Sequence, residues 1–288
     1  MRITAEGLSW SVSGAPVVRG VDLDIAPGET VGLLGPNGSG KSSLLRCLAG
    51  LRVPDAGTVR YDGLSIRDWS ARRIARRIAF VEQDSGFDTD LRVADVVGLG
   101  RTPFRDRWHG PDATDRAVVA AALDRVGLGA LAGRSWKGLS GGERQRAHIA
   151  RAFAQQPYGL LLDEPTNHLD VKHQWELMEL LAGTGQTVLV ALHDLTLAAR
   201  HCDRLLLMHQ GRLVASGAPA AVLTAERLAR FFEVDAELTT DGLGRTAVSY
   251  RGPLHATTHP PVPVPAPAPP SAPAPAPAPA PALRQGTS

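Results

Sequence analysis

The chain has 288 residues with 31 basic and 29 acidic side chains, and this near balance argues against a bulk nucleic-acid-binding protein. Its cysteines, Cys47 and Cys202, lie too far apart for a disulfide framework and show no metal-ligand spacing. No apolar run approaches the ~18 residues of a membrane-spanning helix, and the first residues lack the apolar core of a secretory signal. We therefore expect a cytosolic chain that does not itself span a membrane and binds no nucleic acid.

The composition divides the chain into two regions. Up to about residue 252 it is that of an ordinary globular protein, whereas residues 260–282 are almost entirely Pro and Ala. Alternating proline fixes φ and removes backbone donors, so neither helix nor sheet can form there. We expect residues 1–252 to fold as one domain and residues 253–288 to be a disordered tail, either without a role or acting as a spacer or a partner's ligand.

Short apolar segments alternate with helical ones through the first region. Because strands that alternate with helices form parallel sheets, we predict an α/β fold with a largely parallel sheet covered on both faces. In chain order, the pattern predicts strands at 17–25 and 30–34, a helix at 42–51, a strand near Val81, mostly helix from 112 to 155 with a helix end at Gly127, and strands at 158–162 and 187–192.

A glycine-rich loop carries the first functional motif. Residues 35–42 fit G-x-x-x-x-G-K-[ST], with an apolar strand before them and a predicted helix after them. Such a loop points its N–H groups at phosphate oxygens, and the helix N-terminus adds its positive dipole end. We expect Lys41 to reach the β and γ phosphates and the Ser42 hydroxyl to bind Mg²⁺. The predicted phosphate-binding residues are Gly35, Pro36, Asn37, Gly38, Ser39, Gly40, Lys41, Ser42 and Ser43.

Two adjacent acids end a later buried strand. Leu160, Leu161 and Leu162 lead directly into Asp163 and Glu164. Burying neighbouring carboxylates is costly unless they have a partner, and a magnesium nucleotide is such a partner. We therefore expect Asp163 to bind Mg²⁺, directly or through water, and Glu164 to polarise an attacking water.

The order of further motifs resembles that of the ATP-binding-cassette (ABC) ATPases. The carrying residues are L-S-G-G-E-R-Q-R at 139–146, Gln83 after an apolar strand, D-E-P-T-N-H-L-D at 163–170, and His193 after a strand. The resemblance covers roughly residues 1–215. It implies a P-loop NTPase core with a mainly parallel sheet, an antiparallel N-terminal β-subdomain, and an inserted helical subdomain at about 86–155.

The resemblance also implies a mechanism. Two ATP molecules with Mg²⁺ would lie between the subunits of a head-to-tail homodimer, where Ser140, Gly141 and Gly142 contact the partner's γ-phosphate. Gln83 would contact Mg²⁺ and the attacking water and take part in catalysis, and His193 would hold the γ-phosphate. Asp170 would lie at the dimer interface.

The adenine contact departs from the family pattern. The family usually stacks adenine on an aromatic residue of the first hairpin, and that position falls on Val12. Trp10 is two residues earlier, on the same face if the strand is regular. We favour Trp10 slightly, with Val12 as the weaker apolar alternative.

Residues 91–105 are similar to the V-x-x-x-G-R-x-P stretch of iron-siderophore, haem and cobalamin importer ATPases. This similarity implies that the chain works at the cytoplasmic face of the cell membrane. Its partners would be a membrane permease and, indirectly, an extracytoplasmic substrate-binding protein. The alternatives are an exporter ATPase and a soluble cassette acting on ribosomes or DNA. A P-loop kinase is a further alternative, but it would lack residues 139–143.

Overall fold

A sheet of six strands forms the centre of the described residues, which are 1–82, 89–105, 110–240 and 242–254 of the computed structural model. Its strands are β3 (Thr30–Leu34), β6 (Ile78–Val81), β7 (Gly159–Asp163), β8 (Thr187–Ala191), β9 (Arg204–His209) and β10 (Arg212–Gly217). They lie in the order β10-β9-β3-β8-β7-β6, and only β10 pairs antiparallel. These pairings confirm the predicted, largely parallel sheet. Every residue of β3, β7 and β8 is buried, so both faces of these strands are covered, as predicted.

A second, antiparallel sheet is built mainly from the N-terminal part of the chain. It has the order β2-β1-β4-β5. Its strands are β1 (Ile3–Val12), β2 (Ala15–Ile25), β4 (Ala56–Tyr61) and β5 (Leu64–Ser65). In β2 the buried positions alternate with exposed ones towards its C-terminal end, as in a sheet with one face on the core. The antiparallel subdomain that the family resemblance implies is therefore present.

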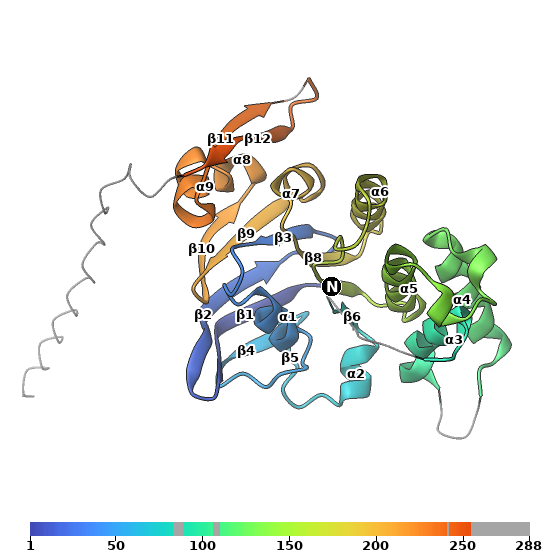
Figure 1. Ribbon diagram of the computed structural model, residues 1–288. Coiled ribbons are helices and arrows are strands. Elements are labelled where there is room, and N and C mark those ends of the chain that lie inside the picture. The colour runs from blue at the N-terminus through green and yellow to red at the C-terminus, as the bar shows by residue number, and fades with distance from the viewer. Residues whose placement is uncertain (83–88, 106–109, 241, 255–288) are drawn as a thin grey trace, which may run out of the picture. The chain divides into compact units, whose positions relative to one another are not determined.

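The two faces of the parallel sheet pack against different layers. In β7, Leu161 belongs to the core shared with helix α1 (Lys41–Leu48) and the antiparallel sheet. Its neighbours Leu160 and Leu162 belong to the other core, shared with α5 (Gly141–Ala154), α6 (Val171–Ala182) and α7 (Leu195–His201). Figure 1 shows these two layers, with α1, β1, β2 and β4 on one side of the parallel sheet and α6 and α7 on the other. Alternating side chains of one strand thus enter both cores.

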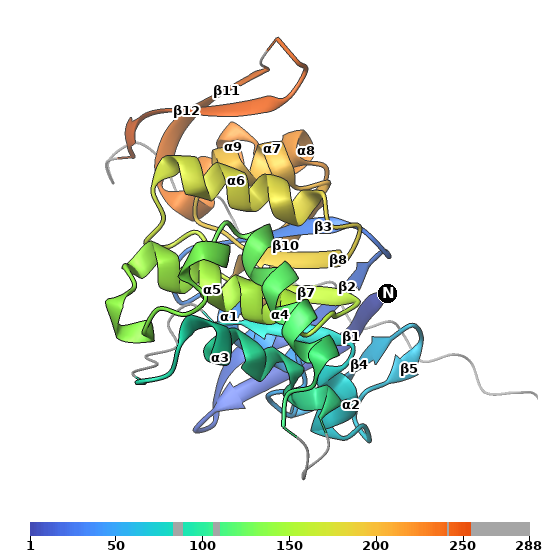
Figure 2. The same ribbon diagram turned by 90° about the vertical axis from the view of Figure 1, so that its right-hand side faces the viewer.

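A group of helices lies between β6 and β7 in the chain. It consists of α3 (Val93–Gly98), α4 (Ala113–Arg125), α5 and three short 3-10 helices (Leu99–Phe104, Gly129–Leu131 and Trp136–Gly138). Figure 2 shows α3, α4 and α5 gathered together in green. These elements fall within the predicted helical subdomain, and α4 ends just before Gly127, whose φ is +70°. Before β6 comes the short helix α2 (Ala71–Ala75).

Helix α1 ends three residues before the predicted end at Leu51. Gly50 has φ +68°, and the N–H of Leu51 donates to the carbonyl of Arg46 while that of Gly50 donates to Cys47. This pair of bonds is the Schellman ending, in which a left-handed glycine stops the helix.

The described chain continues past the predicted boundary at residue 252 to Leu254. Helices α8 (Pro219–Val222) and α9 (Ala225–Phe232) are followed by a hairpin of β11 (Val234–Thr240) and β12 (Thr246–Pro253). Most of the predicted tail therefore lies outside the described residues. Among the described residues, no helix is long and apolar enough to cross a membrane.

Candidate nucleotide-binding site

The predicted phosphate loop connects β3 to α1 and needs glycine at two positions. Gly35 has φ +149°, and a Cβ there would lie 2.2 Å from the carbonyl oxygen of Met208. Gly40 has φ +103°, and a Cβ there would lie 2.7 Å from the carbonyl oxygen of Val17. Both contacts are with backbone and cannot give way. The loop is therefore held against β9 and β2 in a conformation that side chains would prevent.

Lys41 lies inside this loop and is only 5% exposed. Its Nζ donates to the carbonyl oxygen of Gly35 at 2.8 Å and to that of Pro36 at 3.3 Å. Burial lowers the pKa of the Lys41 ammonium, and the nearby carboxylates of Glu164 and Asp163 oppose that shift. A buried cation held by carbonyl oxygens is placed to exchange these contacts for phosphate oxygens.

One cavity joins the phosphate loop to the ends of β7 and β8. Because β3, β8 and β7 are parallel neighbours, the segments that follow them meet at the same edge of the sheet. The cavity is lined by Val17, Asn37, Gly38, Ser39, Gly40, Lys41, Ser42, Ser43, Glu164, Asn167 and His193. The structure thus gathers most of the predicted phosphate-binding residues with Glu164 and His193.

Asp163 and Ser42 form a pair that fits a divalent cation. The Ser42 hydroxyl donates to Asp163 Oδ1 at 3.0 Å. Asp163 is 1% exposed, and its other oxygen, Oδ2, has no hydrogen-bond partner within the described residues. Burial raises the pKa of Asp163. An orphaned carboxylate oxygen beside a hydroxyl is the hard oxygen donor set that Mg²⁺ prefers.

Glu164 is held from two sides. Its Oε1 lies 2.5 Å from His193 Nε2, and its Oε2 accepts a hydrogen bond from Asn167 Nδ2 at 2.9 Å. Glu164 is 7% exposed and has φ +52°, a left-handed conformation that is uncommon outside glycine. This backbone turn follows β7 directly and places the carboxylate in the cavity beside Lys41.

The loop after Glu164 is tied to two helices by amide side chains that sequence reasoning did not identify. Gln145 of α5 donates to the carbonyl oxygen of Pro165 at 3.0 Å. Gln174 of α6 donates to those of Thr166 and Leu169, each at 3.2 Å. Gln145 lies two residues after the L-S-G-G-E pentapeptide, and this position was the available signal.

The predicted signature residues begin α5 but do not line this cavity. The Ser140 hydroxyl accepts from the N–H of Glu143 at 3.2 Å, and a Glu143 oxygen accepts from the N–H of Ser140 at 2.7 Å. This capping box begins α5 at Gly141. Gly141 and Gly142 lie beside His168, in the loop that precedes α6.

Asp170 caps the N-terminus of α6. Its Oδ1 accepts from the N–H of His173 at 2.9 Å and lies 2.7 Å from the His173 Nδ1. Gln83, predicted to act in catalysis and at the magnesium, lies outside the described residues. Its role stays a prediction.

The two candidates for adenine contact lie outside the cavity lining. The guanidinium of Arg52 lies 4.0 Å from the ring centroid of Trp10 and covers one face of the indole. Val12 is 50% exposed at the end of β1. The pairing of β1 with β2 is irregular on both sides of Trp10, so the regular alternation assumed for the two residues does not hold there. Arg52 would have to move before Trp10 could stack on a base through that face, and the choice between the two stays open.

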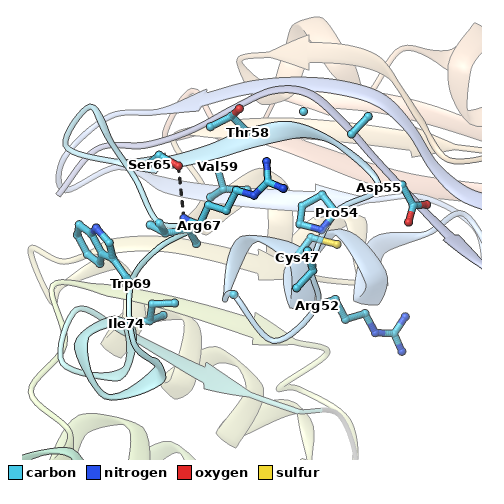
Figure 3. Close-up of a pocket in the computed structure, with 15 residues that line it drawn as sticks. Cys47, Arg52, Pro54, Asp55, Thr58, Val59, Ser65, Arg67, Trp69 and Ile74 are labelled. Atoms are coloured by element: carbon cyan, nitrogen blue, oxygen red, sulfur yellow. Dashed lines mark hydrogen bonds between the residues drawn. The ribbon is translucent and has the colours of Figure 1, made fainter.

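Figure 3 shows a separate cavity between the end of α1 and the strands β4 and β5. None of the predicted nucleotide-binding residues lines it. Its one thiol belongs to Cys47, and burial raises the pKa of that thiol to about 11, so it is protonated and unreactive at neutral pH. Arg67 and Ser65 line it on the strand side, where the backbone N–H of Arg67 donates to the Ser65 hydroxyl oxygen at 3.4 Å. We assign no chemistry to this cavity.

Comparison with known proteins agrees with the geometry. The profile of the ABC transporter family matches residues 18–167. The chain is 44% identical over 242 residues to the hemin import ATP-binding protein of Pseudomonas putida, a match that covers 81% of this chain and 93% of that protein.

Two solved structures extend the likeness to the fold. A metal-chelate type ABC transporter in an inward-facing conformation superposes with a TM-score of 0.74 and 27% identity, covering 86% of this chain and 96% of that one. A dimeric ATP-binding cassette in a post-hydrolysis state, bound to ADP and Pi, gives a TM-score of 0.67 and 28% identity, covering 75% and 98%. The chain therefore belongs to the ABC transporter family, as one of its ATPases.

Proposed function

We propose that two copies of this chain associate head to tail around two ATP molecules and drive the import of a metal chelate of the haem class through a membrane permease. One observation carries the dimer. The cavity around Lys41 is lined by the phosphate loop, Glu164, Asn167 and His193, whereas Ser140 at the start of α5 lies outside it. A second copy can supply its own α5 N-terminus to the open side, and the dimeric relative supports this arrangement.

Within each site the residues have separate tasks. The phosphate-loop N–H groups and Lys41 would hold the β and γ phosphates, and Ser42 and Asp163 would hold Mg²⁺. When bound, Mg²⁺ neutralises phosphate charge. Glu164 would orient a water in line with the γ-phosphate and accept its proton, while His193 would turn from Glu164 to the γ-phosphate. Water attack would then release ADP and phosphate.

The transported class rests on similarity, because an ATPase of this kind need not touch the cargo. The 44% identity to a hemin import subunit and the likeness to a metal-chelate transporter support a haem or related chelate as cargo. An importer of this kind places the ATPase at the cytoplasmic face of the membrane, bound peripherally to its permease. An extracytoplasmic substrate-binding protein would deliver the chelate.

The test is capture of the partner. Tagged full-length protein carrying Glu164→Gln is incubated with detergent-solubilised native membranes, ATP and Mg²⁺, and bound proteins are identified by mass spectrometry. The control is Lys41→Ala, which should not hold ATP. We expect a polytopic permease with the first variant. Recovery of only exporter subunits, or of only ribosomal or DNA-associated proteins, would contradict the import proposal.

The recovered permease then gives the cargo. The permease is reconstituted with the wild-type chain, and the ATPase activity of this complex is measured with the cognate binding protein loaded with haem, a ferric siderophore or cobalamin. We expect haem to stimulate most strongly. Stimulation by none of the three would contradict the chelate class.

A further inference from the structure

Asn167 makes a contact with Glu164 that the motifs do not assign. The chain reverses direction after β7, and the N–H of Asn167 donates to the carbonyl oxygen of Glu164 at 3.2 Å. The same turn brings Asn167 Nδ2 to 2.9 Å from Glu164 Oε2. The left-handed φ of Glu164, +52°, closes this turn. Asn167 also lines the cavity around Lys41, so its amide lies on the reacting side of the loop.

The contacts on Glu164 divide between its two oxygens. Oε1 faces His193 Nε2, and Oε2 faces the Asn167 amide. The His193 side chain is 43% exposed, whereas the backbone of Asn167 is held in the turn by its N–H bond to the Glu164 carbonyl oxygen. When His193 leaves, Oε1 becomes available for water while Oε2 keeps its amide donor. The carboxylate would therefore keep its orientation through the step that exposes it.

We propose that Asn167 is a positioning residue that orients the Glu164 carboxylate to accept the proton of the water that attacks the γ-phosphate. This inference rests on the proposed role of Glu164 as the base. A carboxylate held by a hydrogen bond samples fewer orientations, so the water that it binds stays aligned with the γ-phosphate.

Asn167 is separable from the residues that shape the loop. The carbonyl oxygens of Pro165, Thr166 and Leu169 are held by Gln145 and Gln174. Shortening Asn167 leaves those three bonds in place. A loss of activity in such a variant would therefore report on Glu164 more than on the fold of the loop.

The experiment compares Asn167→Ala and Asn167→Asp in the full-length chain, with kcat and KM for ATP, binding of a fluorescent ATP analogue, and thermal unfolding. Asn167→Ala should lower kcat about tenfold with KM and nucleotide affinity within about twofold of wild type. Asn167→Asp keeps the shape of the side chain but replaces the donor by a like charge beside Glu164. It should lower kcat further than Asn167→Ala does.

That order distinguishes positioning from structure. If Asn167 merely fills space, the isosteric Asn167→Asp should be the milder change, and this result would overturn the proposal. Gln174→Leu is the matched control, because it releases Thr166 and Leu169 without touching Glu164. We expect it to lower the unfolding temperature and to change kcat less than Asn167→Ala.

Glu164→Gln separates the two claims. If it abolishes hydrolysis while both Asn167 variants keep kcat within about twofold, the inference fails and the role of Glu164 stands. If Glu164→Gln hydrolyses ATP normally, the assignment of the base itself is wrong. A variant that unfolds is identified by its melting curve, and Asn167→Ser then replaces it in the same comparison.

Discussion

At the residue scale, the candidate site contains charged side chains whose burial disfavours their charged forms. Asp163 and Glu164 could be predicted from sequence because two acids at the end of an apolar run need a partner. Asn167 could not be predicted as a partner of Glu164. Its contact depends on the left-handed turn at Glu164, and a glutamate does not predict a left-handed backbone conformation.

The orphaned oxygen of Asp163 gives a stability prediction. Burial raises the pKa of this carboxyl, so ionising it costs free energy in the folded protein, and the cost fades as the pH falls through that pKa. Asp163→Asn keeps an oxygen for Ser42 and removes the buried charge. We expect the nucleotide-free variant to be more stable at neutral pH, with the advantage shrinking in acid.

Thermal unfolding with and without ATP and Mg²⁺ checks this. The variant should melt higher than wild type without ligand and gain less from the ligand, because in our proposal the Asp163 carboxylate binds Mg²⁺. A variant that melts lower than wild type without ligand would show that the Asp163 carboxylate stabilises the empty site.

At the scale of elements, the helical insertion is fixed by a charge cluster within it. Arg101 in the 3-10 helix is 6% exposed, and its Nε donates to Asp115 Oδ1 of α4 at 2.9 Å. Arg105 donates to the other oxygen of Asp115 at 2.8 Å. The sequence predicts a helical insertion here but not this pair, because charged residues in a surface subdomain are normally solvated. The capping box at Ser140, by contrast, follows a local pattern, a serine with a glutamate three residues later, that the sequence itself displays.

Breaking this cluster should destabilise the insertion. Asp115→Ala leaves the Arg101 guanidinium buried without its carboxylate, a change that costs about 3–5 kcal/mol. We expect a fall of roughly 6–20 °C in the unfolding temperature. The arginines hold the pKa of Asp115 below its usual range, so the difference from wild type should narrow in acid, where this carboxylate protonates and its stabilising charge is lost.

Glu237→Ala is the matched control for Asp115→Ala. It breaks the pair of Arg251 with Glu237, whose side chains are 60% and 52% exposed, and should leave the unfolding temperature unchanged. Equal changes in unfolding temperature for the two substitutions would show that burial of the Asp115 ion pair adds nothing to the stability of the fold.

At the scale of the whole molecule, the topology explains why the motifs meet. The phosphate loop, Glu164 and His193 follow β3, β7 and β8, three neighbouring parallel strands, so a sequence pattern of strand followed by polar residue predicts their meeting at one edge. Of the antiparallel sheet, the local pattern predicts the strand at 17–25, whereas the sheet as a whole follows from the family resemblance, since β1 also pairs with the distant β4. The ligand of the signature residues cannot be found within a single copy of the chain, because we propose that the N-terminus of α5 contacts the nucleotide of a second copy.

Association of two copies is therefore the central claim, and one measurement tests it directly. The mass of full-length Glu164→Gln is determined by size-exclusion chromatography with light scattering, with and without ATP and Mg²⁺, while bound nucleotide is quantified. Ser140→Arg in the same background blocks the start of α5 and leaves the phosphate loop intact. We predict a dimer only with ATP, and a monomer that still binds ATP when Ser140→Arg is added. A Glu164→Gln protein that binds ATP and stays monomeric would contradict the account.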